Sequence, residues 1–477
     1  MKIIEQLKKN SEVNPSKVGF IDEDGMMSNK EMYDAIINFS NSKFLENQAK
    51  VITLVSENSL SFLIGFFGII KSGKIVHIIP SNISKINLDK QILNSNTDAI
   101  IVHNEKEYEN FSKFKIPIYL INDFKSNLGK TNNFLSNNQI SHLIYTSGTT
   151  DIPKGVPISH EMIEFTTNNI VNVLKYNSKD IDLIPLPLHH SFGLGCIFTS
   201  ITAGSTIVLM KNVNNLENFF QKIEKYKITT IAALPITLTK SLKFEKNFLE
   251  SKFSNIRLII TNSTTIPKNT INQYVQILKN GFLATYYGLT ESSRSTFMIF
   301  NNNSKFYDSV GKMAPGVNIR IDKNISDDLE LGEIMINGKN VLEKYWNNYD
   351  ADKKIESNWL RTGDLGYIDN EGYLFLKGRT DDIINIGGEK VVPNEIENVV
   401  KQIDGVEEVI AFGIQNDVFG QVIKLNVIKN KNSNLKNTDI IMHCLKKLEK
   451  FKIPSKVEFV DTFPKNEYGK VKRFELK

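Results

Sequence analysis

The sequence has little of what a secreted, membrane-spanning or zinc-binding protein needs. It contains two cysteines, Cys196 and Cys444, which are too few for a disulfide framework or a cysteine-rich zinc site. Its longest apolar run, Phe62 to Ile70, is far short of the ~20 residues of a membrane-spanning helix. The first ten residues lack the apolar core of a signal peptide. We therefore expect a reduced, cytoplasmic protein with no membrane span.

A surplus of charge is also missing. The 58 basic and 53 acidic residues leave a net charge of +5, which is small for 477 residues and gives no indication of a nucleic-acid partner. Arginine is scarce, because six of the 58 basic residues are arginines and the other 52 are lysines. In such a composition, we expect an arginine where a planar, bidentate cation is needed.

Hydrophobic residues make up 41% of the chain, and strand-like segments alternate with helix-like ones. The strand-like segments are 50–55, 75–79, 99–102, 118–121, 142–145, 205–209 and 229–233, and helical spacing covers 60–71 and 216–226. The last hundred residues differ, with shorter strand-like segments at 409–412 and 422–427 and a charged helix at 439–450. This pattern predicts an α/β fold with buried sheets. We expect a large N-terminal lobe of several subdomains over 1–380 and a small, mobile α+β lobe over 381–477, joined at the polar segment 378–382.

One short segment has the pattern of a phosphate-binding loop. It runs from Thr146 to Gly155 and reads Thr-Ser-Gly-Thr-Thr-Asp-Ile-Pro-Lys-Gly, directly after a strand-like segment. Hydroxyls and backbone N–H groups of such a loop can surround phosphate oxygens, and the lysine adds a positive charge. It is not a Gly-x-x-x-x-Gly-Lys-Ser/Thr loop, because Pro153 stands five residues after the first glycine. We predict phosphate contacts from six residues: Thr146, Ser147, Gly148, Thr149, Thr150 and Lys154.

This segment resembles the phosphate loop of the adenylate-forming superfamily, which includes acyl- and aryl-CoA ligases, firefly-type luciferases and the adenylation domains of peptide synthetases. Asp151 stands where the superfamily usually has glycine. Further segments resemble motifs of the same superfamily in the same order along the chain. They are Leu186–Gly193, Tyr286–Glu291, Gly332–Gly338 with Tyr345-Trp346, Arg361–Gly366, Gly378–Glu389 and Pro464–Lys470.

The resemblance implies adenylation, in which a carboxylate attacks the α-phosphate of ATP and pyrophosphate leaves. Glu291, with Thr149 or Thr150, matches the magnesium ligands, and their hard oxygens suit this cation. Lys470 matches the lysine that bridges the substrate carboxylate and the α-phosphate. The predicted catalytic set is Lys470, His190, Thr149 and Glu291.

The resemblance also places the rest of the nucleotide. Tyr287 matches a residue that stacks on adenine, and Gly288 and Thr290 belong to the same motif. Asp364 matches the acceptor of the ribose hydroxyls, and Arg379 matches a donor to the ribose or to phosphate.

Ordinary structural roles compete with each assignment. A glutamate after a threonine is usually a solvated helix residue, and an aspartate after a glycine is usually a turn residue. His189 and His190 are as consistent with core positions as with a role beside the substrate. Metal ligation by them is disfavoured, because among the other His and Cys residues only Cys196 stands at ligand spacing. The functional assignments depend on the order of the motifs rather than on any single residue.

A second half-reaction is implied as well, in which the acyl group passes to a pantetheine thiol. Asp381 matches the hinge about which the small lobe rotates. Gly387 and Gly388 match the segment along which the thiol passes, although a Gly-Gly pair is most often a turn. The acceptor is coenzyme A or the prosthetic arm of an acyl-carrier protein, and the sequence does not separate the two.

Peptide-synthetase adenylation domains hold the α-amino group of their substrate with an aspartate in the segment that matches residues 185–195. This segment contains no aspartate, so the resemblance implies an acid without a free α-amine. Residues 262–265, Asn-Ser-Thr-Thr, replace the usual Gly-Gly-Ala-Pro of acyl-CoA ligases and favour a hydroxylated, short or aromatic acid. We therefore predict an ATP-dependent acid–thiol ligase. The alternatives are a stand-alone adenylation enzyme that loads a carrier protein and a non-catalytic nucleotide- or acyl-binding relative. The last should lack a reactive residue, yet all are present: Thr149, Glu291, Asp364, Arg379 and Lys470.

Overall fold

The computed structural model describes residues 3–46, 49–121, 139–146, 153–301, 304–323, 331–416, 418–431, 433–464, 471, 473 and 476. The chain divides into two compact units. The first comprises Met1–Tyr307, Gly311–Asn318 and Asn337–Leu360, and the second comprises Asp308–Val310, Ile319–Ile336 and Arg361–Lys477. Within the described ranges, no helix has both the length and the apolar character needed to cross a lipid bilayer.

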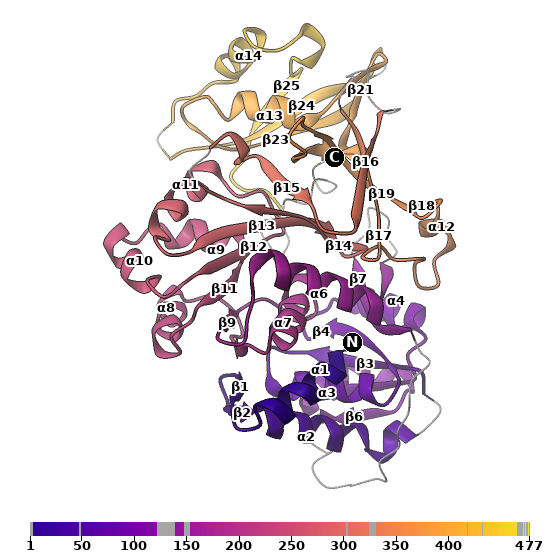
Figure 1. Cartoon of the computed structure of the whole chain (residues 1–477). Coiled ribbons are helices and arrows are strands. Elements are labelled where there is room, and N and C mark those ends of the chain that lie inside the picture. Colours follow the sequence, from indigo (N-terminus) through magenta and orange to yellow (C-terminus); the bar gives the residue numbers. More distant parts are fainter. Residues whose placement is uncertain are drawn as a thin grey trace. The chain divides into compact units, whose positions relative to one another are not determined.

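A six-stranded sheet forms one part of the first unit (Figure 1). Its strands lie in the order β6-β5-β3-β4-β7-β8, and all neighbours are parallel except β7 and β8. The strands are β3 (Val51–Ser56), β4 (Ile75–Pro80), β5 (Ala99–Val102), β6 (Ile118–Leu120), β7 (Ile140–Thr146) and β8 (Lys154–Ser159), and the connecting helices are α3 (Leu60–Lys71), α4 (Lys85–Ser95) and α5 (Glu105–Phe111). Parallel strands that alternate with helices confirm the predicted α/β class.

A second sheet completes the first unit. Its strands lie in the order β2-β1-β10-β9-β11-β12-β13-β14-β15, parallel from β1 to β13 and antiparallel at both ends. The strands are β1 (Val18–Ile21), β2 (Met26–Ser28), β9 (Ile181–Ile184), β10 (Thr206–Leu209), β11 (Thr230–Ala233), β12 (Leu258–Thr261), β13 (Phe282–Leu289), β14 (Ser292–Ile299) and β15 (Ser309–Met313).

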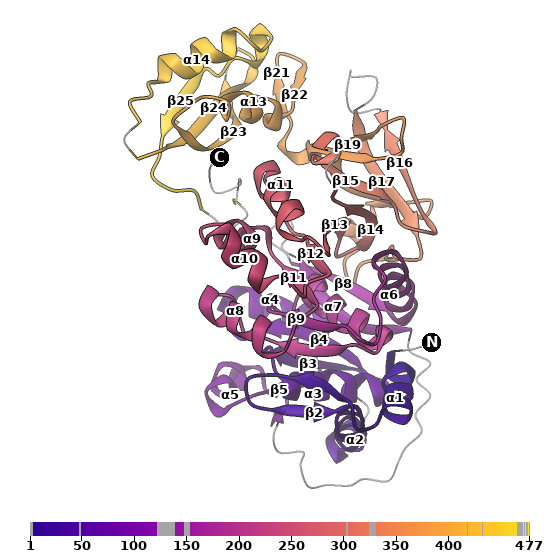
Figure 2. The ribbon, with the colours of Figure 1, turned by 60° about the vertical axis from the view of Figure 1, so that its left-hand side comes forward.

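The first unit contains further helices besides α3, α4 and α5. They are α1 (Ile3–Val13), α2 (Asn29–Ser40), α6 (His160–Leu174), α7 (Ser191–Ala203), α8 (Leu216–Lys225), α9 (Pro235–Ser241), α10 (Lys246–Lys252) and α11 (Lys268–Ile277), followed later by α12 (Tyr349–Asp352) and the short strand β18 (Ile355–Glu356). Helices α8, α10 and α11 lie together beside the sheet in both views (Figures 1 and 2).

Helices α3 and α7 meet in the core of the first unit. The ring of Phe66 in α3 lies 6.0 Å from that of Phe198 in α7 and 5.5 Å from that of His142 in β7, between ring centroids. The Ser59 hydroxyl caps α3 by accepting from the Phe62 N–H at 3.2 Å. The strands predicted in this unit and the two helices predicted at 60–71 and 216–226 are all present, with ends that differ by one residue or two.

The second unit contains two groups of strands. The first group lies in the order β16-β17-β19-β20 and consists of β16 (Val317–Asp322), β17 (Gly332–Gly338), β19 (Trp359–Ile368) and β20 (Leu374–Arg379). The polar segment predicted as a joint ends β20 and continues as a 3₁₀ turn over Thr380–Asp382. The division near residue 380 stays a prediction, because the two compact units part at other positions.

The second group of strands has a hydrophobic core of its own. It lies in the order β22-β21-β24-β23, with β25 (Lys456–Phe459) parallel to β24 and with helices α13 (Pro393–Val400) and α14 (Asn437–Leu445) (Figure 2). The other strands are β21 (Ile384–Ile386), β22 (Glu389–Val391), β23 (Val406–Asn416) and β24 (Gly420–Lys429). Their shared core contains Val391, Ile396, Val400, Ala411, Leu425, Val427, Ile440 and Cys444.

Two expectations for this region are wrong. Strands β23 and β24 have 11 and 10 residues, so they are long rather than short. Backbone pairing extends the hairpin from Val406↔Lys429 to Asn416↔Gly420, beyond the apolar cores that the sequence displays. The predicted helix over 439–450 instead runs from Asn437 to Leu445.

The buried His77 makes the stability of the first unit depend on pH. Its ring Nδ1 lies 2.9 Å from Thr53 Oγ1, and burial lowers its pKa to about 4. An unfolded histidine titrates near ~6.5, so the unfolded state binds more protons between these two values. The contribution to the free energy of unfolding is therefore complete above pH ~6.5 and is lost as the pH falls through that window.

We expect His77→Gln to reduce the slope of unfolding free energy against pH between pH 4.5 and 6.5 by up to about 1.4 kcal/mol per pH unit. Urea unfolding at several pH values measures this slope. Thr53→Val is the matched control, because it removes the contact with the ring and leaves the titrating group in place. Equal slopes in the wild type and His77→Gln would contradict the prediction.

Candidate active site

The predicted phosphate loop is flanked by a β hairpin. Thr146 ends β7, Lys154 begins β8, and the two residues are register partners in this antiparallel pair. The four other predicted phosphate contacts, Ser147, Gly148, Thr149 and Thr150, lie outside the described residues, as does Asp151. The hairpin therefore fixes the two ends of the loop opposite each other.

Gly155 brings the strand after the loop against a distant segment of the chain. The Trp346 N–H donates to the Gly155 carbonyl oxygen at 2.9 Å, and the Trp346 Nε1–H donates to the Ser95 carbonyl oxygen at 3.3 Å. A Cβ at position 155 would lie 3.0 Å from the Tyr145 ring and 3.1 Å from Cβ of Trp346. A glycine is favoured here because the backbone lies so close to these two side chains.

The neighbouring residue, Tyr345, holds the predicted magnesium ligand. Its hydroxyl donates to Glu291 Oε1 at 3.1 Å, and the Leu342 N–H donates to the Glu291 carbonyl oxygen at 2.9 Å. Burial raises the pKa of Tyr345, and the charge of Glu291 and the hydrogen bond to it raise that pKa further. Tyr345 therefore remains a protonated donor, and the pair Tyr345-Trp346 connects Glu291 to the strand that follows the phosphate loop.

The hairpin of β13 and β14 carries the predicted adenine motif. Tyr287 pairs with Thr296, and the register shifts between Tyr287 and Leu289. A Cβ at Gly288 would lie 2.5 Å from the backbone nitrogen of Arg294, so a larger residue does not fit there. Tyr287 is 6% exposed and Thr290 is half-buried. Contact of this motif with adenine stays a prediction.

The two adjacent histidines lie between β9 and α7. His190 precedes the first residue of α7, and its ring lies 4.0 Å from the ring of His189, between centroids. Burial lowers the pKa of His190 to about 2, and the neighbouring His189 lowers it further. His190 is therefore a neutral imidazole across the physiological range, able to form hydrogen bonds without adding charge.

The predicted ribose-binding residues are paired with each other in the second unit. Asp364 and Arg379 are register partners on β19 and β20, and Arg379 Nη1 donates to Asp364 Oδ1 at 2.7 Å and to the Thr362 carbonyl oxygen at 3.1 Å. The predicted hinge, Asp381, is exposed and lies 3.6 Å from Arg379 Nη2 through its Oδ2. The structure thus places Asp364, Arg379 and Asp381 in one cluster.

The two glycines of the predicted thiol segment form a tight turn. Gly387 and Gly388 connect β21 to β22 and have φ values of 60° and 100°. Such left-handed values at both turn positions favour glycine, so the turn alone accounts for this pair. Their role beside a thiol stays a prediction.

The catalytic lysine of the prediction, Lys470, lies outside the described residues. Arg473, three residues later, lies within the described residues. Its Nη1 donates to the Ala411 carbonyl oxygen at 2.8 Å and its Nη2 donates to Glu397 Oε1 at 2.7 Å, so it is held against the rest of the second unit.

Asn58, which no sequence motif indicates, supports the histidine segment. Its Nδ2 donates to the carbonyl oxygens of Leu186 at 2.8 Å and Met210 at 2.9 Å, and its Oδ1 accepts from the Leu188 N–H at 3.1 Å. These partners are more than 100 residues away in sequence, so no local pattern could reveal them. Asn58 therefore helps to fix the chain just before His190.

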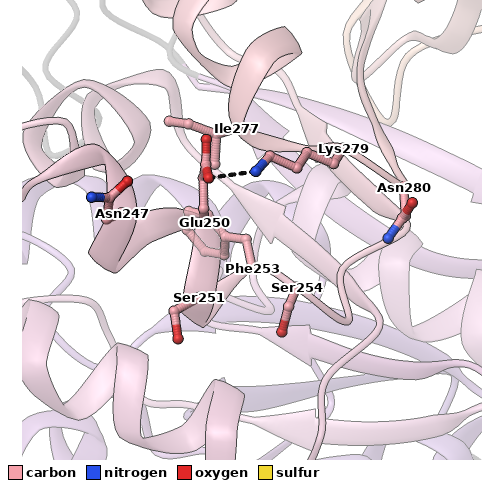
Figure 3. A pocket seen from close by; sticks show the side chains of 8 residues that line it. All are labelled: Asn247, Glu250, Ser251, Phe253, Ser254, Ile277, Lys279 and Asn280. Atoms are coloured by element: carbon pink, nitrogen blue, oxygen red, sulfur yellow. Dashed lines mark hydrogen bonds and ion pairs between the residues drawn. The ribbon is translucent and has the colours of Figure 1, made fainter.

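The first unit has a surface pocket beside α10 and α11 (Figure 3). An ion pair of 2.7 Å between Lys279 and Glu250 crosses it. It is lined by Asn247, Glu250, Ser251, Phe253, Ser254, Ile277, Lys279 and Asn280, none of which belongs to the predicted site. We attach no role in the reaction to this pocket.

We expect Asn58→Ala to lower the free energy of unfolding by at least about 2 kcal/mol, because it leaves three buried backbone groups without their partner. Urea unfolding measures the loss, and hydrogen exchange at Leu188 shows whether it is local. Asn247→Ala is the control at an exposed asparagine. A loss equal to that of the control would contradict the prediction.

Comparison with known proteins shows the family of this chain. A family model described as AMP-binding enzyme matches residues 7–346, and one described as AMP-binding enzyme C-terminal domain matches residues 395–470. The chain is 32% identical over 345 residues to a putative acyl–CoA ligase, YdaB, of Bacillus subtilis, and 31% identical over 349 residues to oxalate–CoA ligase of Saccharomyces cerevisiae. These matches cover 69% and 71% of this chain, but only 66% and 63% of the relatives, just under two thirds of their length.

Other similarities extend over the whole chain. The 2-succinylbenzoate–CoA ligase of Oceanobacillus iheyensis is 27% identical over 480 residues, 98% of each protein. The fold matches that of o-succinylbenzoate CoA synthetase (MenE) from Bacillus subtilis with a TM-score of 0.86, at 24% identity over 99% of this chain and 97% of that chain. It also matches ATP-bound MatB from Rhodopseudomonas palustris with a TM-score of 0.90, at 21% identity over 100% of this chain and 98% of that chain. Because the first family model covers well over half of its residues, this chain belongs to the AMP-binding enzyme family.

Proposed function

We propose that the chain uses ATP to convert a carboxylic acid to an acyl-adenylate, with release of pyrophosphate, and then transfers the acyl group to the thiol of coenzyme A. Membership of the AMP-binding enzyme family supports the first step. Relatives that are named CoA ligases support coenzyme A, rather than a carrier protein, as the acceptor. Cytoplasmic location is part of the proposal and depends on the sequence alone.

One observation carries the proposal. Trp346 contacts the strand that follows the phosphate loop, and Tyr345 donates to Glu291. Two motifs that are more than 130 residues apart, at Gly155 and Glu291, are thereby held by adjacent residues of a third segment. A phosphate loop and an oriented carboxylate held by one support are what a magnesium–nucleotide site requires.

The described residues fit the magnesium ion that such a site would hold. Glu291 is half-buried, and the hydrogen bond from Tyr345 orients its carboxylate. Within the described ranges no cluster of three or more His, Cys, Asp or Glu suits a metal. This agrees with magnesium, which is commonly bound by one or two carboxylates together with substrate phosphates. When bound, the cation neutralises phosphate charge, and Thr149 or Thr150 is proposed as a further ligand.

In the first step an oxygen of the acid attacks the α-phosphorus. The bond between that phosphorus and the oxygen bridging to the β-phosphate breaks, and pyrophosphate leaves. Catalysis depends on positioning and on neutralising charge. Thr146 and Lys154 are proposed to hold phosphate oxygens, neutral His190 to form a hydrogen bond beside the acid, and Lys470 to bridge the acid and the α-phosphate.

The remaining residues are assigned to the ribose and to the second step. Asp364 is proposed to accept from the ribose hydroxyls while Arg379 holds it in place through their 2.7 Å ion pair. In the second step the thiol sulfur attacks the acyl carbonyl carbon, and AMP leaves. Asp381 is proposed as the hinge of the small lobe, and the turn at Gly387 and Gly388 as the segment along which the thiol passes.

The proposal is tested by carboxylate-dependent exchange of pyrophosphate into ATP, with fatty, aromatic, hydroxylated and amino acids and with Mg²⁺ present. We expect exchange with one chemical class, and a thioester when coenzyme A is added. Thioester formed only with a carrier protein would replace the proposed acceptor. Absence of exchange with every acid, in folded protein, would overturn the proposal.

We expect Tyr345→Phe to weaken binding of Mg²⁺·ATP roughly 10-fold, because Glu291 loses the donor that orients its carboxylate. Isothermal titration calorimetry measures this affinity. The control is Tyr349→Phe, at a tyrosine that is 90% exposed. Unchanged affinity in Tyr345→Phe would contradict the role given to this contact.

We expect Gly387→Asn to slow thioester formation by up to about 100-fold while pyrophosphate exchange continues. Asparagine tolerates the φ of 60° at this position, so the turn is kept while a side chain narrows the path of the thiol. Gly372→Asn is the matched control, because Gly372 has a φ of 82° and open space around it. Equal effects on exchange and on thioester formation would contradict the assignment.

A further inference from the structure

Arg294 differs from the other arginines of the chain. Within the described residues, ion pairs with carboxylates hold Arg257 to Asp180, Arg361 to Asp322 and Glu333, Arg379 to Asp364, and Arg473 to Glu397. Arg320 is exposed, whereas Arg294 is only 3% exposed. Among the residues that the structure describes, no carboxylate pairs with Arg294. A buried cation without a carboxylate partner is costly, so its presence needs an explanation.

The unused donors of Arg294 are the pair that best fits a carboxylate. Its Nη1 donates to Ser293 Oγ at 2.8 Å, whereas Nε and Nη2 are buried and donate to no oxygen or nitrogen atom of the described residues. The guanidinium also interacts with the Cys196 thiol, which is a weak acceptor. Nε–H and Nη2–H point in the same direction and can bind both oxygens of one carboxylate. Arg257 uses the same two nitrogens to bind both oxygens of Asp180.

The backbone and a neighbouring helix accommodate this guanidinium at a cost. Arg294 has a φ of 58°, in the left-handed region that a non-glycine residue rarely adopts. Gly195 lies inside α7, where glycine is unfavourable, and a Cβ there would lie 2.1 Å from Arg294 Nη2. Stability alone favours neither choice, whereas a function for the guanidinium accounts for both.

The other groups around Arg294 are neutral. Its guanidinium carbon lies 5.1 Å from the centre of the Tyr286 ring, which Phe192 contacts edge-on at 5.6 Å. Burial raises the pKa of Tyr286 and that of Cys196 to about 12, so both remain protonated near neutral pH. Asn262, which follows β12, forms a side-chain hydrogen bond to Tyr286. Arg294 therefore places its positive charge beside these neutral side chains.

Arg294 also lies in the segments that form the proposed acid site. It follows Glu291 by three residues, and its guanidinium packs on α7, which begins directly after His190. We propose that Arg294 binds a second carboxylate at the far end of the acid, so that the chain activates a dicarboxylic acid. This inference rests on the proposed function and names its class of substrate.

The two N–H donors of Arg294 predict strong selectivity for an acid that ends in a second carboxylate over one that ends in a methyl group. A second carboxylate of the acid would accept from Nε–H and Nη2–H together, and neighbouring side chains must move to admit it, because both nitrogens are covered in this structure. An acid with a methyl group at that end leaves the buried charge without a partner. The site should therefore reject such an acid more strongly than an apolar pocket distinguishes two chain lengths.

The test compares each dicarboxylic acid with the monocarboxylic acid in which a methyl group replaces the second carboxylate, such as glutarate with pentanoate and adipate with hexanoate. Aromatic diacids and their methyl analogues extend the series. For the wild type we expect kcat/KM in pyrophosphate exchange to favour at least one diacid by about 100-fold or more. A wild type that prefers every methyl analogue would overturn the inference and leave the proposed function intact. Silence with all acids would overturn both.

Arg294→Met tests the residue itself. We expect the ratio of kcat/KM for the diacid to kcat/KM for its methyl analogue to fall towards one, mainly because the KM for the diacid rises. Binding of the diacid, measured by calorimetry, should be lost. Gly195→Ala is a second variant, which keeps the charge but displaces the guanidinium. It should weaken binding of the diacid and lower its kcat/KM in the same way. Arg320→Met, at an exposed arginine, should leave the preference unchanged. A full preference for the diacid in folded Arg294→Met or Gly195→Ala would contradict the inference.

Discussion

The structure of the first unit depends on how Tyr345 and Trp346 are held. Trp346 packs on Val51, Ile75 and Leu143 of the six-stranded sheet, and its N–H and indole nitrogen donate to backbone carbonyl oxygens on two sides. This anchoring places the Tyr345 hydroxyl on Glu291. Tyr345 and Trp346, which are anchored to the sheet, thereby hold both the Glu291 carboxylate and strand β8 in place.

Buried polar side chains shape the region around the proposed acid site. Asn58 satisfies three backbone groups before His190, and burial keeps that histidine neutral. Arg294 differs from Asn58, because two of its buried donors reach no oxygen or nitrogen atom of the described residues. Positions of this kind are unfavourable for stability and are therefore where a ligand is best sought. In the second unit, by contrast, the partners of Arg379 include Asp364, which belongs to the same predicted site.

Much of the fold follows from sequence because its signals are local. The buried strands of the first unit and α3 are continuous apolar segments with clear ends, and β17 coincides with the motif Gly332–Gly338. The strands β23 and β24 are longer than their apolar segments because backbone pairing continues through polar residues and glycines, as in Gln415↔Gln421 and Asn416↔Gly420. Helix α14 ends at Leu445, although charged residues continue the helical composition beyond it, so the sequence does not show this end.

The site shows the same division between local and distant signals. The order of motifs predicted Glu291, Asp364 and Arg379, but not the contacts that orient them. The support from Asn58 and the donor Tyr345 depend on segments far apart in sequence, which no pattern within a motif can reveal. The scarcity of arginine draws attention to Arg294, but its burial and its two donors without an oxygen or nitrogen partner in the described residues are properties of the fold that the sequence does not display.

The most direct test of the shared support is a double-mutant cycle on the affinity for Mg²⁺·ATP, measured by calorimetry with Tyr345→Phe, Gly155→Ala and the double variant. A Cβ at position 155 pushes against Trp346 and so displaces its neighbour, Tyr345. The account predicts that Tyr345→Phe costs much less in the Gly155→Ala background than in the wild type. Additive losses would contradict it, because the loop and the carboxylate would then be supported independently.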